Sequence, residues 1–152
     1  MSRAFVKEQE SVEELPERLI SEHANLVTPA GLKHIEAEVA RYDAAHAAAQ
    51  AEGDREAMAA TARELRYWST RLGTAELVRV PADGDHVHFG STVTIEREDG
   101  RRQTYRIVGE DEADPAKGSV SFVSPLARSL VGKAVGDTVK VAGTDAEITE
   151  IE

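Results

Sequence analysis

Two apolar seams separated by one glycine constrain the fold of this 152-residue chain more than any other feature. Within each seam the apolar positions alternate spacings of three and four residues, which places them on one face of a helix. The seams comprise Leu32, Ile35, Val39, Tyr42, His46 and Ala49, and then Met58, Thr61, Leu65, Trp68, Leu72 and Ala75. Because a short turn at Gly53 joins seams of similar length, residues 27–75 are predicted to form an antiparallel helical hairpin, a two-helix coiled coil.

Local signals mark the ends of this hairpin. Thr28 is a good N-cap, and Pro29 suits the first helical position, where a missing N–H costs nothing. Gly73 is the predicted C-terminal stop of the second helix. His46 lies on the seam and has no second histidine one turn away, so we interpret it as a packing residue rather than a metal ligand.

From Glu76 onward the pattern changes to alternating apolar and polar residues. The segments that carry it are ELVRV, HVHF, STVTIER, RQTYRIV, SVSFV, DTVKV and AEITEI. They predict an antiparallel β-sheet domain over residues 76–152. Between the fifth and sixth segments, PLARSLVG predicts one short helix, capped by Ser124, begun by Pro125 and ended by Gly132. The fold class is therefore α+β, and the expected core members are Val93, Ile95, Tyr105, Ile107, Phe122 and Val139.

The first 26 residues are Glu-rich and are interrupted by Pro16. Their apolar residues, Phe5, Val12, Leu15, Leu19 and Ile20, are too scattered to form a helix face. We expect an extended acidic arm. It is either a loosely ordered tail or a segment that docks on a partner or on the second domain.

Charge and composition exclude several classes of function. With 28 acidic and 18 basic residues the net charge is -10, which argues against stand-alone binding to nucleic acid. Without cysteine there is no disulfide, thiolate nucleophile or cysteine metal site. No apolar run is long enough to span a membrane and no signal peptide is visible, so we expect a cytoplasmic protein. His86 and His88 could lie on one face of a strand, but no third ligand is near, and we expect no metal or cofactor.

Four motifs are dense in the C-terminal part of the sequence and span roughly half the chain: FGSTVTI, TYRIVGEDEAD, SPLARSLVGK and VGDTV. Through them this part of the chain resembles the C-terminal domain of the GreA/GreB transcript cleavage factors. In that family an antiparallel coiled coil precedes an FKBP-like domain. The order of segments read from periodicity agrees with this arrangement.

The resemblance implies that the partner is bacterial RNA polymerase. It also implies that the protein is a monomer whose FKBP-like domain binds the rim of the polymerase's secondary channel. The matching docking positions lie in the loop 109–114 and in the segment 124–128. They are Asp111, Glu112 and Asp114, and Ser124, Pro125 and Leu126. Two simpler interpretations stay open: the loop is a solvated turn, and Ser124 with Pro125 only starts the short helix.

At the tip of the hairpin the sequence departs from the family pattern. Cleavage-competent members resemble one another in G-D-x-x-E-N followed by tyrosine, whose two acidic side chains help to hold a magnesium ion. The tip residues here are Glu52, Gly53, Asp54 and Glu56. Ala57 stands where the second carboxylate is expected, and Glu56 is displaced by about 100° around the helix. Each arm is also about nine or ten residues shorter, a deficit of about 14 Å. We therefore expect no catalytic residues.

The predicted function is that of a non-cleaving Gre-family regulator, which acts by occupying the secondary channel. The alternative is an active cleavage factor that uses Asp54 with Glu56 or Glu52. A third interpretation, a prolyl isomerase, follows from the fold alone. It is weak because the domain has only three aromatic residues, Phe89, Tyr105 and Phe122, most of which should be core.

Overall fold

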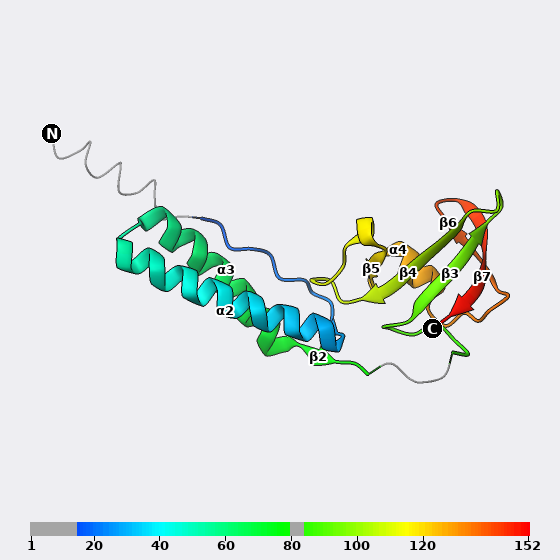
Figure 1. Ribbon diagram of the computed structural model, residues 1–152, viewed down its shortest axis with the longest axis horizontal. Helices are drawn as coiled ribbons and strands as arrows, with labels where there is room; N and C mark the ends of the chain where they lie inside the picture. Colours follow the sequence, from blue (N-terminus) through cyan, green and yellow to red (C-terminus); the bar gives the residue numbers. More distant parts are fainter. Residues whose placement is uncertain (1–14, 80–83) are drawn as a thin grey trace. The chain divides into compact units, whose positions relative to one another are not determined.

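The computed structural model describes residues 15–79 and 84–152, which form two compact units (Figure 1). The first contains residues 15–24 and 33–75, and the second contains residues 25–32, 76–79 and 84–152. The expectations for Phe5, Val12 and Val80 lie outside the described residues.

Two long helices form the predicted hairpin. They are α2 (Pro29–Glu52) and α3 (Arg55–Thr74), which lie side by side in Figure 1. His46 Nδ1 lies 3.0 Å from the Thr61 hydroxyl, and the rings of His34 and Trp68 meet edge to face at 5.4 Å. Every predicted seam residue is buried or half-buried, so the seam is confirmed. Neither these helices nor any other in the described part of the chain could cross a membrane.

The helix ends follow the local signals with one shift. The Thr28 hydroxyl accepts the Gly31 N–H at 3.0 Å, as expected of an N-cap, and Pro29 is the first residue of α2. Gly53 has φ +66°, a left-handed conformation that glycine adopts readily, and it separates the two helices. Gly73 does not end α3, because the helix continues to Thr74 and Ala75 caps it.

The second unit contains a five-stranded sheet with the order β5-β4-β3-β7-β6. Its strands are β3 (Thr92–Arg97), β4 (Arg102–Val108), β5 (Ser119–Ser121), β6 (Thr138–Val141) and β7 (Thr144–Ile151). The pairs β3–β4, β3–β7 and β6–β7 are antiparallel, but β4 and β5 are parallel. The sheet is therefore mixed, and the prediction of an antiparallel sheet was wrong for this pair. The connection 109–118, which includes the 3₁₀ turn η1 (Pro115–Lys117), carries the chain back so that β5 runs in the direction of β4.

The core of this unit lies between the sheet and the short helix α4 (Pro125–Leu130). Ala127 and Leu130 of α4 are fully buried against apolar side chains of the strands. Four of the predicted core members, Val93, Ile95, Ile107 and Val139, are buried, and Tyr105 and Phe122 pack against them. The α+β class and the core are confirmed.

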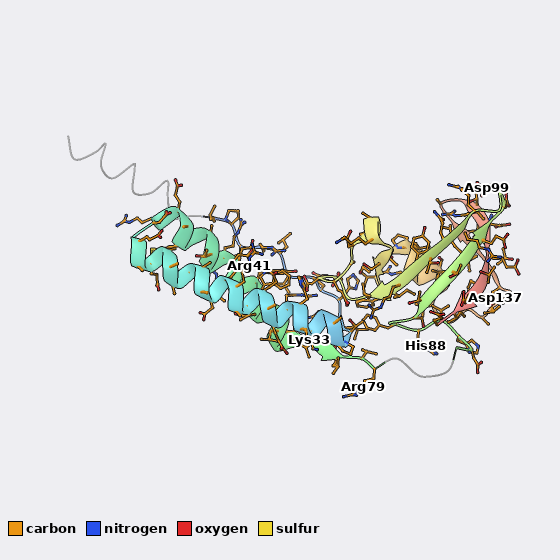
Figure 2. The ribbon with its side chains drawn as sticks, in the orientation of Figure 1. Lys33, Arg41, Arg79, His88, Asp99 and Asp137 are labelled. Atoms are coloured by element: carbon orange, nitrogen blue, oxygen red, sulfur yellow. The ribbon has the colours of Figure 1, made fainter. Side chains whose placement is uncertain are left out.

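Two predicted strands are absent from this sheet. Instead, β2 (Glu76–Leu77) pairs in parallel with β1 (Leu26–Val27), a strand that crosses the predicted boundary between the arm and the hairpin. Residues 86–89 form no strand, although Val87 is buried and its N–H donates to the Lys133 carbonyl at 2.8 Å. His86 and His88 are therefore not paired on a strand face; His88 lies in the loop before β3 (Figure 2).

Candidate protein-binding surfaces

The four predicted tip residues of the hairpin, Glu52, Gly53, Asp54 and Glu56, are all exposed. Asp54 is the N-cap of α3, and its carboxylate accepts the Ala57 N–H at 3.1 Å. Its carbonyl accepts the Met58 N–H at 2.9 Å. An aspartate in this position satisfies backbone donors that a helix start leaves unpaired, so Asp54 has a structural role here. An aspartate directly before an Ala-rich helical run is a recognisable cap signal, and it could have been read from the sequence.

The other tip carboxylates do not gather around Asp54 into a cluster. Glu56 lies in the first turn of α3, where its negative charge is favourable next to the helix N-terminus. Glu52 is the last residue of α2. Over residues 15–79 and 84–152, no group of three or more histidine, aspartate or glutamate side chains is arranged to hold a metal ion. The chemistry available at the tip is that of a hydrophilic helical turn.

The acidic loop 109–114 is tightly folded against the start of α2. Both the Glu112 and Ala113 N–H groups donate to the Gly109 carbonyl at 3.2 Å. The Glu112 carboxylate accepts a 2.6 Å hydrogen bond from the buried hydroxyl of Thr28, which in turn accepts the Gly31 N–H. Glu112 thus orients the residue that caps α2. No local sequence signal predicted this role.

The two aspartates of the loop are half-buried, which does not fit a freely solvated turn. The Asp114 carboxylate lies 4.0 Å from the Lys117 ammonium, and the Asp114 N–H bonds to the Ser119 carbonyl at 3.1 Å. Backbone bonding therefore holds Asp114 at the end of the loop while its side chain, about half of it accessible, still reaches solvent.

The start of α4 forms part of a pocket of about 440 Å³. Ser124 caps the helix by accepting the Ala127 N–H at 3.2 Å, Pro125 is exposed, and Leu126 packs on the core. All three line the pocket together with the side chains of Tyr105, Arg97 and Lys140. The structure thus brings the predicted α4 residues together in one wall. Asp111, Glu112 and Asp114 are not part of it.

The three aromatic residues weighed for prolyl isomerisation pack against the core. Phe89 and Phe122 meet edge to face with ring centres 5.5 Å apart, and Tyr105 packs against the same cluster. Tyr105 lines the 440 Å³ pocket, whereas Phe89 and Phe122 line a separate pocket of about 350 Å³ with Leu26, Arg128 and Val131. The three aromatic residues are therefore divided between two pockets.

Comparisons with known proteins agree with the resemblance read from the sequence. Residues 81–152 match the family described as transcription elongation factor, GreA/GreB, C-terminal domain. The chain is 41% identical over 106 residues to transcription elongation factor GreA of Desulfovibrio desulfuricans, a match that covers 68% of this chain and 60% of that protein. It is 44% identical over 80 residues to transcription elongation factor GreB of Pasteurella multocida, which covers 52% of this chain and 51% of the relative.

The chain thus spans about half to three fifths of the length of these relatives. A more distant likeness, with a TM-score of 0.42 and 18% identity, relates 86% of the chain to 99% of the crystal structure of GreA factor homolog 1 of Thermus thermophilus. That likeness is too weak to add to the assignment. The C-terminal match carries the assignment: residues 81–152 belong to the family of GreA/GreB C-terminal domains.

Proposed function

We propose that this protein binds bacterial RNA polymerase through its C-terminal domain and regulates elongation by occupying the secondary channel, without stimulating transcript cleavage. The family membership of residues 81–152 supports the choice of partner, since two relatives carry the name transcription elongation factor. The proposed docking residues are those of the acidic loop and of the start of α4. The protein would contribute an occupying surface rather than catalytic groups of its own.

One observation carries the non-cleaving part of the proposal: the arrangement at the hairpin tip. The Asp54 carboxylate caps α3 through the N–H of Ala57, at the position where a second carboxylate would be needed. Magnesium requires several oxygen ligands in near-octahedral geometry at about 2.0–2.1 Å, and a single capping aspartate supplies too few of them.

The length of the hairpin supports the same conclusion. The helices α2 and α3 contain 24 and 20 residues, which correspond to about 36 and 30 Å of helix at 1.5 Å per residue. Because each arm is about nine or ten residues shorter than the family pattern, the tip would lie about 14 Å closer to the base of the hairpin. Catalytic groups must be placed within about 0.5 Å of their working geometry, so this deficit matters more than any single tip residue.

The first prediction is that the protein alone does not shorten the RNA of a backtracked polymerase complex. RNA lengths would be followed on gels, with an authentic cleavage factor as positive control. Asp54→Asn is the informative variant, because asparagine caps a helix about as well as aspartate but carries no charge. Rapid RNA shortening that disappears in Asp54→Asn would show that the tip does support cleavage. If the protein slows the authentic factor in the same assay, occupancy of the channel is supported.

The second prediction concerns docking by the acidic loop. Replacing Asp111 and Asp114 together by asparagine should weaken binding to core polymerase about tenfold, and more at low salt than at high salt. Glu112 is left unchanged because its carboxylate holds Thr28. Affinity would be measured at two salt concentrations, with thermal unfolding as a check on the fold.

A matched control for this variant is available on the same domain. The double variant Glu98→Gln, Glu147→Gln changes the net charge by the same amount. Both residues are exposed; Glu98 follows the last residue of β3, and Glu147 lies on β7 opposite Glu96 of β3. We expect its affinity to stay within about twofold of the parent, since exposed charges distant from an interface contribute little. Equal weakening by both double variants would mean that overall charge, and not the loop, determines the binding.

A further inference from the structure

An ion-pair and aromatic contact holds the described part of the N-terminal arm on helix α3. The Arg18 guanidinium lies 2.7 Å from the Glu64 carboxylate and 3.6 Å from the centre of the Tyr67 ring. It also lies 5.8 Å from the centre of the Trp68 ring. A carboxylate and an aromatic face that meet around one planar cation form a site suited to a guanidinium group.

A second contact beside the first fixes the direction of the arm. The Glu17 carboxylate accepts two hydrogen bonds from the Arg66 guanidinium, one of them 3.0 Å long from Nε. This hydrogen bonding to Arg66 lowers the pKa of the Glu17 carboxyl below its ordinary value. The acid Glu17 therefore pairs with the base Arg66 on α3, and the next residue of the arm, the base Arg18, pairs with the acid Glu64 on α3.

The apolar residues of the arm contribute unequally to its attachment. Leu19 is 94% exposed, whereas Leu15 and Ile20 are 41% and 40% exposed. Leu15 and Ile20 therefore add some hydrophobic burial, and Leu19 adds almost none. The specific contacts of this segment with α3 are the polar and cation–π contacts of Glu17 and Arg18.

We propose that Glu64 and Tyr67 form a guanidinium-binding site on α3, and that Arg18 is its intramolecular ligand, so that residues 15–24 act as a reversible strap on the hairpin. The ligand class is a peptide segment in which a carboxylate residue precedes an arginine. Since Arg18 keeps 36% of its side chain accessible and the Glu17–Arg66 pair is exposed, salt should weaken the strap. The proposal does not depend on the polymerase-binding function.

The composition of the 152-residue chain allows a direct test without truncating it. It contains no cysteine and one tryptophan, Trp68, next to the site. A Leu19→Cys variant labelled with bimane, a dye that tryptophan quenches at short range, reports whether the arm lies on α3. We expect strong quenching in this background. Arg18→Ala should shift the ratio of open to closed arm about fivefold to tenfold and raise the fluorescence accordingly.

Three further variants separate a guanidinium site from simple attraction. Arg18→Lys keeps the charge but loses the planar group, and it should release the arm nearly as much as Arg18→Ala. Glu64→Gln should do the same, and combining it with Arg18→Ala should add little. Arg41→Ala is the matched control, because Arg41, which Figure 2 labels on the hairpin, contacts Glu38 and Tyr42 of its own helix α2.

The control should leave the quenching unchanged. Circular dichroism would check that every variant retains its helices. Quenching that persists in folded Arg18→Ala would overturn the proposal, since the arm would then be held by other contacts. Quenching fully retained in Arg18→Lys would also overturn it, by showing that the site recognises charge alone.

Discussion

Replacing Leu130 by alanine should lower the free energy of unfolding of the C-terminal domain by about 2–5 kcal/mol. Leu130 is the last residue of α4, and its side chain is fully buried against the core of the sheet. The substitution removes apolar contacts and leaves a cavity that the surrounding strands fill only in part. A domain of this size has a limited free energy of unfolding, so the loss should be evident in denaturant unfolding.

The same variant tests the role of α4 in docking. Ser124, Pro125 and Leu126 lie on the helix that Leu130 anchors, so a loosened α4 should also weaken binding to polymerase. Val135→Ala is the control, because Val135 is 55% exposed and its truncation should change stability by less than about 0.5 kcal/mol. A loss of stability no larger in Leu130→Ala than in this control would mean that α4 is not anchored by Leu130.

The hairpin could be predicted in detail because its determinants are local. Ile35 and Trp68 lie on seams whose spacing alone predicts that they are buried, and both are. Thr28 and Pro29 mark the first turn through the chemistry of helix starts. The predicted end of α3 at Gly73 was one residue early, because the helix continues to Thr74. Glycine often ends a helix through a left-handed turn, but Gly73 adopts no such turn and has no close neighbour that would require a glycine.

The sheet was predicted less completely, because alternation indicates a strand but not its partner or direction. The pattern of residues 119–123 does not reveal that β5 runs parallel to β4. The alternation of residues 86–89 is also strand-like, yet the Val87 backbone bonds to Gly132 and Lys133 in the loop after α4. Strand pairing depends on contacts between residues distant in sequence, and the alternation of apolar and polar residues does not identify them.

The roles of candidate site residues could likewise be predicted where their contacts are local in sequence, but not where the contacts join distant segments. The capping role of Asp54 depends on Ala57, three residues on, and so was accessible from the sequence. The bond between Thr28 and Glu112 joins residues 84 positions apart, and it gives one of the three predicted docking carboxylates a structural role. Nor did the pattern of the arm indicate that Arg18 contacts α3, because its ligands Glu64 and Tyr67 lie on another segment.

A substitution at Gly109, where β1 approaches the acidic loop closely, should also destabilise the C-terminal domain strongly. Gly109 is buried, and a Cβ atom added to it would lie 2.4 Å from the carbonyl oxygen of Leu26. Real Cβ atoms do not approach backbone atoms so closely, and a backbone carbonyl cannot swing aside as a flexible side chain can. Gly109→Ala should therefore push the loop and β1 apart at a cost of about 3 kcal/mol.

Hydrogen exchange would locate this damage. The Glu76 and Val78 N–H groups donate to the carbonyls of Asn25 and Val27, so in Gly109→Ala both amides should lose protection before the amides of β3 and β7 do. The control is Gly73→Ala, where an added Cβ meets nothing within 4 Å. Because alanine favours a helix, that variant should unfold at the same free energy or up to about 1 kcal/mol higher. If Gly109→Ala retained the parent's stability and its amide protection at Glu76 and Val78, the loop would have room to relax, and glycine would not be required at this position.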